Sequence, residues 1–177
     1  RNKGLEICGD PEEAHVIFIS EDAGIREDGV RDLTKVNEYI ALARGYGAVT
    51  VLTSQVPPGF TRALKMEIYH QAETLRIKDA RERAAQPEYI AVGCEDSREA
   101  LPQTYLTYLR AFNCPIIQCT YEEAEFSKIA VNMTLASQVE NTNRLSEAAK
   151  RIPGVKWGVI AQILYHDRRI GPYSYLK

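Results

Sequence analysis

Short apolar runs alternate along the chain with longer stretches in which apolar residues recur every three or four positions. Runs rich in β-branched residues predict four buried strands, at 15–20, 48–54, 89–94 and 115–120. The helical spacing predicts intervening helices over 32–47, 57–70 and 101–112. Strands that alternate with helices are typical of an α/β fold with a largely parallel sheet.

The stretch 121–151 contains neither glycine nor proline, and its apolar positions keep a helical spacing. One helix of about 30 residues is therefore expected, roughly 45 Å long at 1.5 Å per residue. The segment "IPG" (152–154) ends it, and 155–167 predicts a shorter helix. An apolar stripe runs along the long helix: Phe126, Ile129, Ala130, Met133, Ala136, Val139 and Leu145. A stripe of this size predicts a homodimer through helix 121–151.

Composition narrows the function classes. The 177 residues are 45% hydrophobic and 26% charged with a net charge of −2, so we expect a soluble globular chain without a nucleic-acid partner. No apolar run approaches the roughly 20 residues of a membrane span, and the first residues lack a signal-peptide core, which predicts a cytoplasmic location without membrane association. Four scattered cysteines and three histidines show no metal-ligand spacing, so reduced thiols and no metal are expected.

Lys128 and Asn132 stand four positions apart inside the long predicted helix. Residues at this spacing share a helix face, so the two polar groups lie one above the other. From spacing alone, the usual interpretation is a solvated face on which the lysine stem covers apolar neighbours. The alternative is a site in which an ammonium and an amide meet the same ligand atom.

Five segments, in this order, carry a resemblance: "DPEEAHVIFIS" (10–20), "DLTKV" (32–36), "VTVLTSQVPPG" (49–59), "AEFSKIAVNMTLASQVENTN" (124–143) and "DRRIG" (167–171) with "YLK" (175–177). Over nearly its whole length the chain resembles the UDP-glucose/GDP-mannose dehydrogenase family. The resemblance implies that residues 1–120 are the C-terminal half of an NAD-binding Rossmann-like domain. Residues 121–177 would form a central helical dimerisation and substrate domain. Because no GxGxxG precedes the first strand, we expect a truncated central portion of a longer protein.

Enzymes of this family oxidise the C6 alcohol of a nucleotide sugar to a carboxylate with NAD, through a cysteine thioester. The resemblance implies catalytic roles for Lys128 and Asn132, which would stabilise an oxyanion and order a water. "YHQAETLRIKDARERA" (69–84) places Glu73 on the first glutamate of a family motif and Ile77 on the second, where isoleucine has no acid–base capacity. An alternative alignment gives the role to Glu88.

The family's cofactor turn corresponds to "TSQVPPG" (53–59), which implies that Ser54, Gln55 and Val56 contact NAD. Gln55 replaces the usual threonine. In "ISEDAG" (19–24) the usual "TP" is missing, and Glu21 and Asp22 would face the cofactor, where they would repel a phosphate. For each stretch, a plain strand-to-helix turn is the alternative.

Substrate contacts are implied for six residues: Thr74, Leu75, Arg169, Tyr175, Leu176 and Lys177. A guanidinium suits phosphate because its donors are planar and bidentate, and Arg168 is an alternative to Arg169 in this role. A surface arginine pair is the other interpretation. The family's Gly-rich segment with the nucleophilic cysteine is expected after Lys177, so this chain alone is expected to be inactive.

Two further hypotheses compete with a dehydrogenase. A non-catalytic nucleotide-sugar binding or dimerisation module would explain the departures at Gln55, at Ile77 and at the missing "TP". A Rossmann-like domain of unrelated function would explain the strand–helix alternation alone. The latter predicts that Lys128 and Asn132 point into solvent, away from the end of the 48–54 strand.

Overall fold

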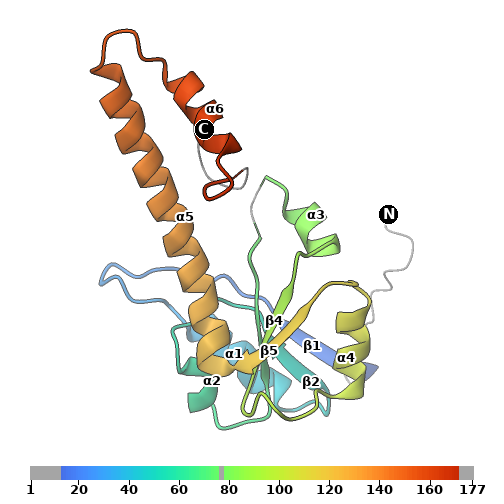
Figure 1. Ribbon diagram of the computed structural model, residues 1–177. Helices are drawn as coiled ribbons and strands as arrows, with labels where there is room; N and C mark the ends of the chain where they lie inside the picture. The colour runs from blue at the N-terminus through green and yellow to red at the C-terminus, as the bar shows by residue number, and fades with distance from the viewer. Residues whose placement is uncertain (1–12, 76–77, 172–177) are drawn as a thin grey trace. The chain divides into compact units, whose positions relative to one another are not determined.

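A five-stranded sheet forms the core of the computed structural model, which describes residues 13–75 and 78–171 (Figure 1). The strands lie side by side in chain order: β1 (Val16–Ile19), β2 (Val49–Leu52), β3 (Tyr69–Ala72), β4 (Ile90–Cys94) and β5 (Ile116–Thr120). Neighbouring strands are parallel except β3 and β4, which are antiparallel, so the sheet is mixed. The α/β class and the four predicted strands are confirmed.

Strand β3 corrects the expectation of a helix over 57–70. Only α2 (Phe60–Ala63) is helical there, and the backbone then turns at Lys65, whose φ is 51°. The chain enters the sheet at Tyr69 between β2 and β4. The apolar spacing of this stretch had the helical period, but burial in the sheet outweighs local propensity in so short a segment.

Helices cover both faces of the sheet (Figure 1). On one face, α1 (Thr34–Ala43) and α2 enclose a cluster that includes Val36, Ile40 and Leu52. On the other face, α4 (Gln103–Arg110) contributes Tyr105 and Leu109, both fully buried. The short helix α3 (Ala80–Ala85) has no buried residue. Two apolar layers around one sheet are the usual way to bury strands of this kind.

The long helix is confirmed as α5 (Tyr121–Lys150), which begins directly after Thr120, the last residue of β5. The helix start packs closely on β4, because a Cβ built on Gly93 would lie 2.7 Å from the Cβ of Ala124. A glycine is therefore needed at this position of the strand.

The chain divides into two compact units, Arg1–Lys128 and Ile129–Lys177. The second unit contains most of α5 and the helix α6 (Trp157–His166), joined by a turn with Gly154 at a φ of 80°. A functional boundary at residue 120 stays a prediction. In the described ranges, no helix combines the length and the apolar character that a bilayer span requires.

Candidate functional site

A cavity of about 250 Å³ opens in the first unit, where the carboxyl ends of three parallel strands meet the start of α5. Its lining comes from four segments: Ser20, Glu21 and Asp22 after β1; Thr53, Ser54, Gln55 and Val56 after β2; His70, Ala72, Glu73 and Leu75 in and after β3; and Glu125 and Lys128 on α5. Ligands of open α/β sheets bind at this edge, because loops that follow neighbouring parallel strands come together there.

The segments after β1 and β2 are joined by hydrogen bonds near the cavity. The Thr53 hydroxyl donates to the Ile19 carbonyl at 3.1 Å, and the buried Ser54 hydroxyl lies 3.5 Å from the same oxygen. Glu21 has Lys35 at 3.8 Å, and Asp22 is exposed. Gln55 is half-buried and its neighbour Val56 is buried. The five predicted cofactor residues therefore line one cavity, and their role stays a prediction.

Lys128 and Glu73 meet in this cavity although 55 positions separate them. The Lys128 Nζ donates a hydrogen bond to the backbone carbonyl of Glu73. Lys128 therefore does not point into open solvent. The hypothesis of an unrelated Rossmann-like domain predicts the opposite orientation for this residue. Lys128 lies about two turns into α5, and this position brings its ammonium next to the strand end that carries the predicted acid.

Burial shifts the pKa values of both groups toward neutrality. Desolvation lowers the pKa of Lys128, although the Glu73 charge opposes this shift and Arg31 adds to it. Desolvation likewise raises the pKa of the Glu73 carboxyl, against the opposing effects of Lys128 and of a hydrogen bond with Gln71. Titratable groups perturbed in this way within a cavity are common at catalytic sites.

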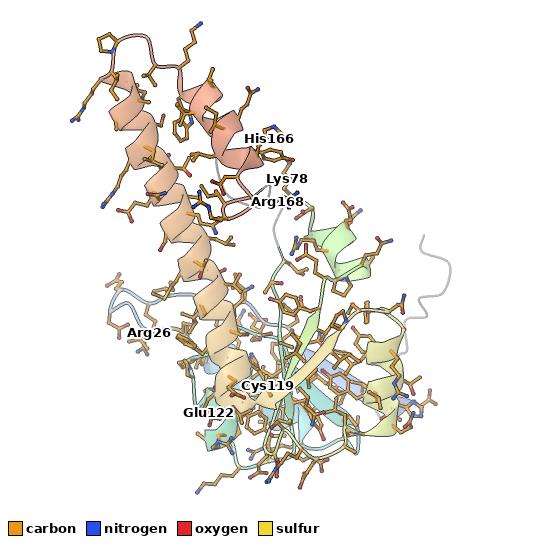
Figure 2. The ribbon with its side chains drawn as sticks, in the orientation of Figure 1. Arg26, Lys78, Cys119, Glu122, His166 and Arg168 are labelled. Atoms are coloured by element: carbon orange, nitrogen blue, oxygen red, sulfur yellow. The ribbon has the colours of Figure 1, made fainter. Side chains whose placement is uncertain are left out.

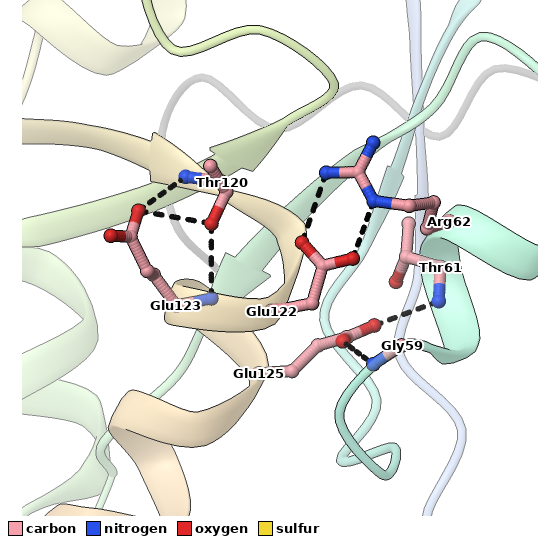
Figure 3. Close-up of polar contacts among 7 residues, drawn as sticks. All are labelled: Gly59, Thr61, Arg62, Thr120, Glu122, Glu123 and Glu125. Atoms are coloured by element: carbon pink, nitrogen blue, oxygen red, sulfur yellow. Dashed lines mark hydrogen bonds and ion pairs between the residues drawn. The ribbon is translucent and has the colours of Figure 1, made fainter.

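Glu125 is a site residue that the sequence analysis missed. Its side chain is 1% exposed, and its carboxylate accepts hydrogen bonds from the backbone N–H groups of Gly59 at 2.5 Å and Thr61 at 2.7 Å (Figure 3). These are free N–H groups at the start of α2, where a carboxylate is stabilising. Glu125 thereby ties the turn after Val56 to the helix that carries Lys128.

His70 is a second residue that the sequence analysis missed. It is 2% exposed and lines the cavity from β3. Alternation along the strand places Tyr69 and Gln71 on the α4 face, where the Tyr105 hydroxyl donates to Gln71 Oε1 at 2.9 Å, and His70 on the opposite face. Burial lowers the pKa of His70 to about 4, so the imidazole is neutral at physiological pH.

The other predicted residues of the first unit lie around a second cavity. Thr74 and the alternative acid Glu88 line this space of about 120 Å³, which Glu73 and Leu75 also border. Glu88 is exposed and pairs with Arg83 at 3.4 Å, away from Lys128's cavity. Of the two alternatives, only Glu73 shares a cavity with Lys128.

The remaining predictions concern the second unit or residues outside the described ranges. Asn132 is exposed on α5. After α6, Arg169 forms an ion pair with Asp167 at 2.6 Å, and its neighbour Arg168 is exposed (Figure 2). Ile77 and the substrate residues Tyr175, Leu176 and Lys177 lie outside the described residues.

Cys94 and Cys119 are poorly suited to nucleophilic chemistry. Cys94 and Cys119 lie on neighbouring strands, and Cys119 is the second-last residue of β5, close to the start of α5 (Figure 2). Desolvation raises the pKa of the Cys94 thiol and raises that of Cys119 to about 11. The thiolate is the reactive form of a thiol, so the raised pKa values disfavour reaction of both groups near neutral pH.

Known proteins are similar to this chain in sequence and in fold. The chain is 26% identical to the UDP-glucose 6-dehydrogenase of Pseudomonas aeruginosa, with 91% of this chain and 40% of the relative covered. The UDP-glucose dehydrogenase structure from Pyrobaculum islandicum superimposes with a TM-score of 0.74 at 28% identity, over 92% of this chain and 41% of that one. No family model matches the sequence.

A second solved structure, the GDP-mannose dehydrogenase of Pseudomonas aeruginosa, gives a TM-score of 0.73 at 21% identity over 94% of this chain and 42% of that one, and so supports the fold alone. The chain is thus similar to nucleotide-sugar dehydrogenases, which are oxidoreductases, and the resemblance seen in the order of its motifs is confirmed. It spans about two fifths of the length of these relatives.

Proposed function

We propose that this chain is the central portion of a nucleotide-sugar dehydrogenase, which oxidises the C6 alcohol of a UDP- or GDP-sugar to the uronic acid with NAD. The observation that carries the proposal is the meeting of Lys128 and Glu73 in one cavity at the carboxyl ends of β1, β2 and β3. The similarity to two UDP-glucose dehydrogenases supports the reaction class.

In this proposal Lys128 is the electrophilic group. Its ammonium, held in place by the Glu73 carbonyl, would stabilise negative charge on the oxygen of the reacting carbon. Asn132, one turn further along α5, would donate to the same oxygen. Because burial lowers its pKa, Lys128 also releases a proton more readily than a solvated lysine does.

Glu73 is the acid–base group of the same proposal. Burial raises the pKa of its carboxyl, so the group is closer to half-protonated at physiological pH and exchanges protons more effectively. NAD, when bound, would supply the hydride acceptor. The residues that would hold it are Ser54, Gln55 and Val56, where Gln55 offers an amide donor and acceptor at the cavity wall.

Substrate binding and assembly complete the proposal. Leu75 borders both cavities and Thr74 the second one, and both would contact the nucleotide sugar. Arg169, with Arg168 as its alternative, would bind a phosphate, and Tyr175, Leu176 and Lys177 would extend the substrate loop. A homodimer through helix 121–151 would supply the neighbouring subunit on which Arg169 acts.

The test is NADH production by the complete polypeptide that contains this chain, followed at 340 nm with NAD and a set of UDP- and GDP-sugars. We expect Lys128→Ala and Glu73→Gln each to lower kcat/KM by at least about 100-fold. Lys150→Ala is the matched control, since this lysine lies at the end of the same helix and pairs with Glu147 on an exposed surface. A fully active Lys128→Ala enzyme would contradict the assigned role.

The alternative function is a non-catalytic nucleotide-sugar binding or dimerisation module derived from the same fold. Gln55 and the acidic Glu21 and Asp22, which line the cavity where the family has other residues, favour it. Calorimetric titration of the complete polypeptide with UDP-glucose separates the two functions. Binding without any NADH from any nucleotide sugar would support the module and exclude the dehydrogenase.

A further inference from the structure

The Lys128 cavity is unusually acidic for a site that would meet a dinucleotide. Among the residues that the structure describes, four carboxyl groups line it, from Glu21, Asp22, Glu73 and Glu125, together with the ammonium of Lys128. The Glu125 carboxylate is occupied by backbone N–H groups, and burial favours the neutral form of Glu73. Glu21 and Asp22, which follow β1, add two further carboxyl groups to the wall that a ligand would meet.

Cations near these acids leave the charge only partly compensated. Lys35 lies 3.8 Å from Glu21, and its side chain is 71% exposed, so the attraction is strongly screened. Arg31 donates to the Ala23 carbonyl at 2.8 Å and lies close enough to lower the pKa of Lys128. Neither cation lines the cavity. A phosphate would be repelled here, whereas a cationic group would be attracted.

An unpartnered polar atom marks the same cavity as a binding site. The Nδ1 atom of His70 is buried and has no hydrogen-bond partner within the part of the chain that the structure describes. Buried polar atoms are almost always paired, and an unpaired one costs free energy that a ligand group can recover. His70 faces a cavity large enough for a ring with polar substituents.

We propose that Glu21, Asp22 and His70 make this cavity select the cationic nicotinamide ring of the oxidised dinucleotide over the neutral ring of the reduced form. The two carboxylates attract the positive ring, and His70 Nδ1 hydrogen-bonds with the carboxamide group attached to it. The inference rests on the proposed function. In it, the two acids that would repel a phosphate determine whether the oxidised or the reduced ring binds more tightly. Such a site releases the reduced product more readily than it releases the oxidised cofactor.

Small ring probes test the selection independently of the sugar reaction. The chain, labelled with ¹⁵N-histidine, is titrated with 1-methylnicotinamide, which is cationic, and with nicotinamide, which is neutral. We expect the cation to bind at least about threefold more tightly, the size of effect that screened carboxylates produce. We also expect it to shift the ¹⁵N resonances of His70, which are identified by their absence from His70→Asn.

Variants assign the selection to its residues. The double variant Glu21→Gln with Asp22→Asn should bind the two rings equally, while the control Glu27→Gln with Glu38→Gln, which changes acids outside the cavity, should keep the preference. His70→Phe should weaken binding of both rings. His70→Asn, whose amide lies close to the Nδ1 position, should restore most of it, and circular dichroism establishes that each variant is folded.

Equal affinities for the two rings in the unmodified chain, binding of neither, or an unshifted His70 would each overturn the selection. These outcomes are distinct from failure of the dehydrogenase proposal, which is decided by NADH production from nucleotide sugars. A ring preference without any NADH would leave the selection standing and remove the sugar chemistry.

Discussion

At the scale of single residues, His70 gives the fold a sensitivity to acid. Above pH 6.5, its ordinary pKa, the imidazole is neutral in both the folded and the unfolded chain, and it contributes no pH dependence. As the pH falls from 6.5 to about 4, the unfolded chain binds a proton that the folded chain does not. The free energy of unfolding should therefore fall by up to about 3 kcal/mol over this window.

Urea denaturation at about pH 7 and about pH 4.5 measures this loss. His70→Gln, which cannot take up a proton, should lose less stability between the two conditions than the unmodified chain does. His15→Gln is a suitable control because His15 is exposed. An identical acid loss in the unmodified chain and in His70→Gln would show that other groups cause it.

The Glu125 side chain should contribute more to the free energy of unfolding than the other acidic residues in the first turns of α5. Removing the carboxylate in Glu125→Ala leaves the N–H groups of Gly59 and Thr61 without their acceptor, at a cost of about 3 kcal/mol. Glu125→Gln keeps an acceptor oxygen and should lose about half as much. Thermal or urea unfolding compares the two variants.

The neighbouring Glu122 provides the control for Glu125. It pairs with Arg62 on the surface, where such pairs contribute at most about 1 kcal/mol (Figure 3). Glu122→Gln should thus be nearly neutral. If Glu125→Ala proves no more destabilising than Glu122→Gln, the anchoring of the turn to α5 is not significant.

The sequence analysis did not identify His70 and Glu125 as site residues, and the reason is physical. Each is polar, and polar side chains are mostly exposed, so neither sequence position indicates burial. Glu125 is buried only because α2 presents free N–H groups to it across 64 positions of sequence. The order of the motifs predicted Lys128 and Glu73 as site residues. It did not predict that they lie in one cavity, because Glu73 is placed there by β3 and the local sequence pattern predicted a helix instead of this strand.

At the scale of elements, the strands that the sequence predicted are those with continuous β-branched runs. β3 lacks such a run, because its four residues "YHQA" include two buried polar side chains, His70 and Gln71. The Tyr105 hydroxyl on α4 donates a hydrogen bond to the buried Gln71 side chain. This contact joins residues far apart in sequence, so the sequence pattern did not predict it. The antiparallel pairing of β3 with β4 was equally inaccessible, since strand direction depends on the path of the connection.

The contact between β4 and α5 should tolerate no side chain at Gly93. In Gly93→Ala the new Cβ would lie 2.7 Å from the Ala124 Cβ and 3.2 Å from both the Thr120 carbonyl oxygen and the Tyr121 Cα. Backbone atoms cannot move aside cheaply, so we expect a loss of about 2 kcal/mol in the free energy of unfolding. Urea denaturation gives the value.

Gly158 offers the opposite case within a helix. It lies in α6, and a Cβ built there has no atom within 4 Å. Gly158→Ala should consequently stabilise α6 by about 0.5 to 1 kcal/mol through helix propensity. Equal effects of the two glycine substitutions would argue against close packing at Gly93.

At the scale of the whole molecule, the exposed apolar side chains of α5 bear on assembly. Met133 is 63% exposed, and Val139 and Leu145 are each 40% exposed. Such residues on one helix are typical of an interface. Met133→Asp combined with Val139→Asp should therefore convert a dimer into a monomer in light scattering, with helical content followed by circular dichroism.

Glu140→Gln with Arg144→Gln is the control for this assembly prediction, because it alters an exposed ion pair on the same helix. It should leave the molecular mass unchanged. A double aspartate variant that keeps the mass of a dimer would place the interface elsewhere, and the homodimer through helix 121–151 would then be wrong.

The direct passage from β5 into α5 fixes the angular position of Lys128. No loop residue separates Thr120 from Tyr121, so the strand end sets where the first helical residue points. Each residue of an α-helix is rotated by about 100° from the one before it. A single inserted residue at this junction would thus swing the ammonium roughly a quarter-turn away from the Glu73 carbonyl, while the helix itself remained intact. The end of β5 therefore sets the direction of every side chain in the first turns of α5, and the proposed role of Lys128 depends on that direction.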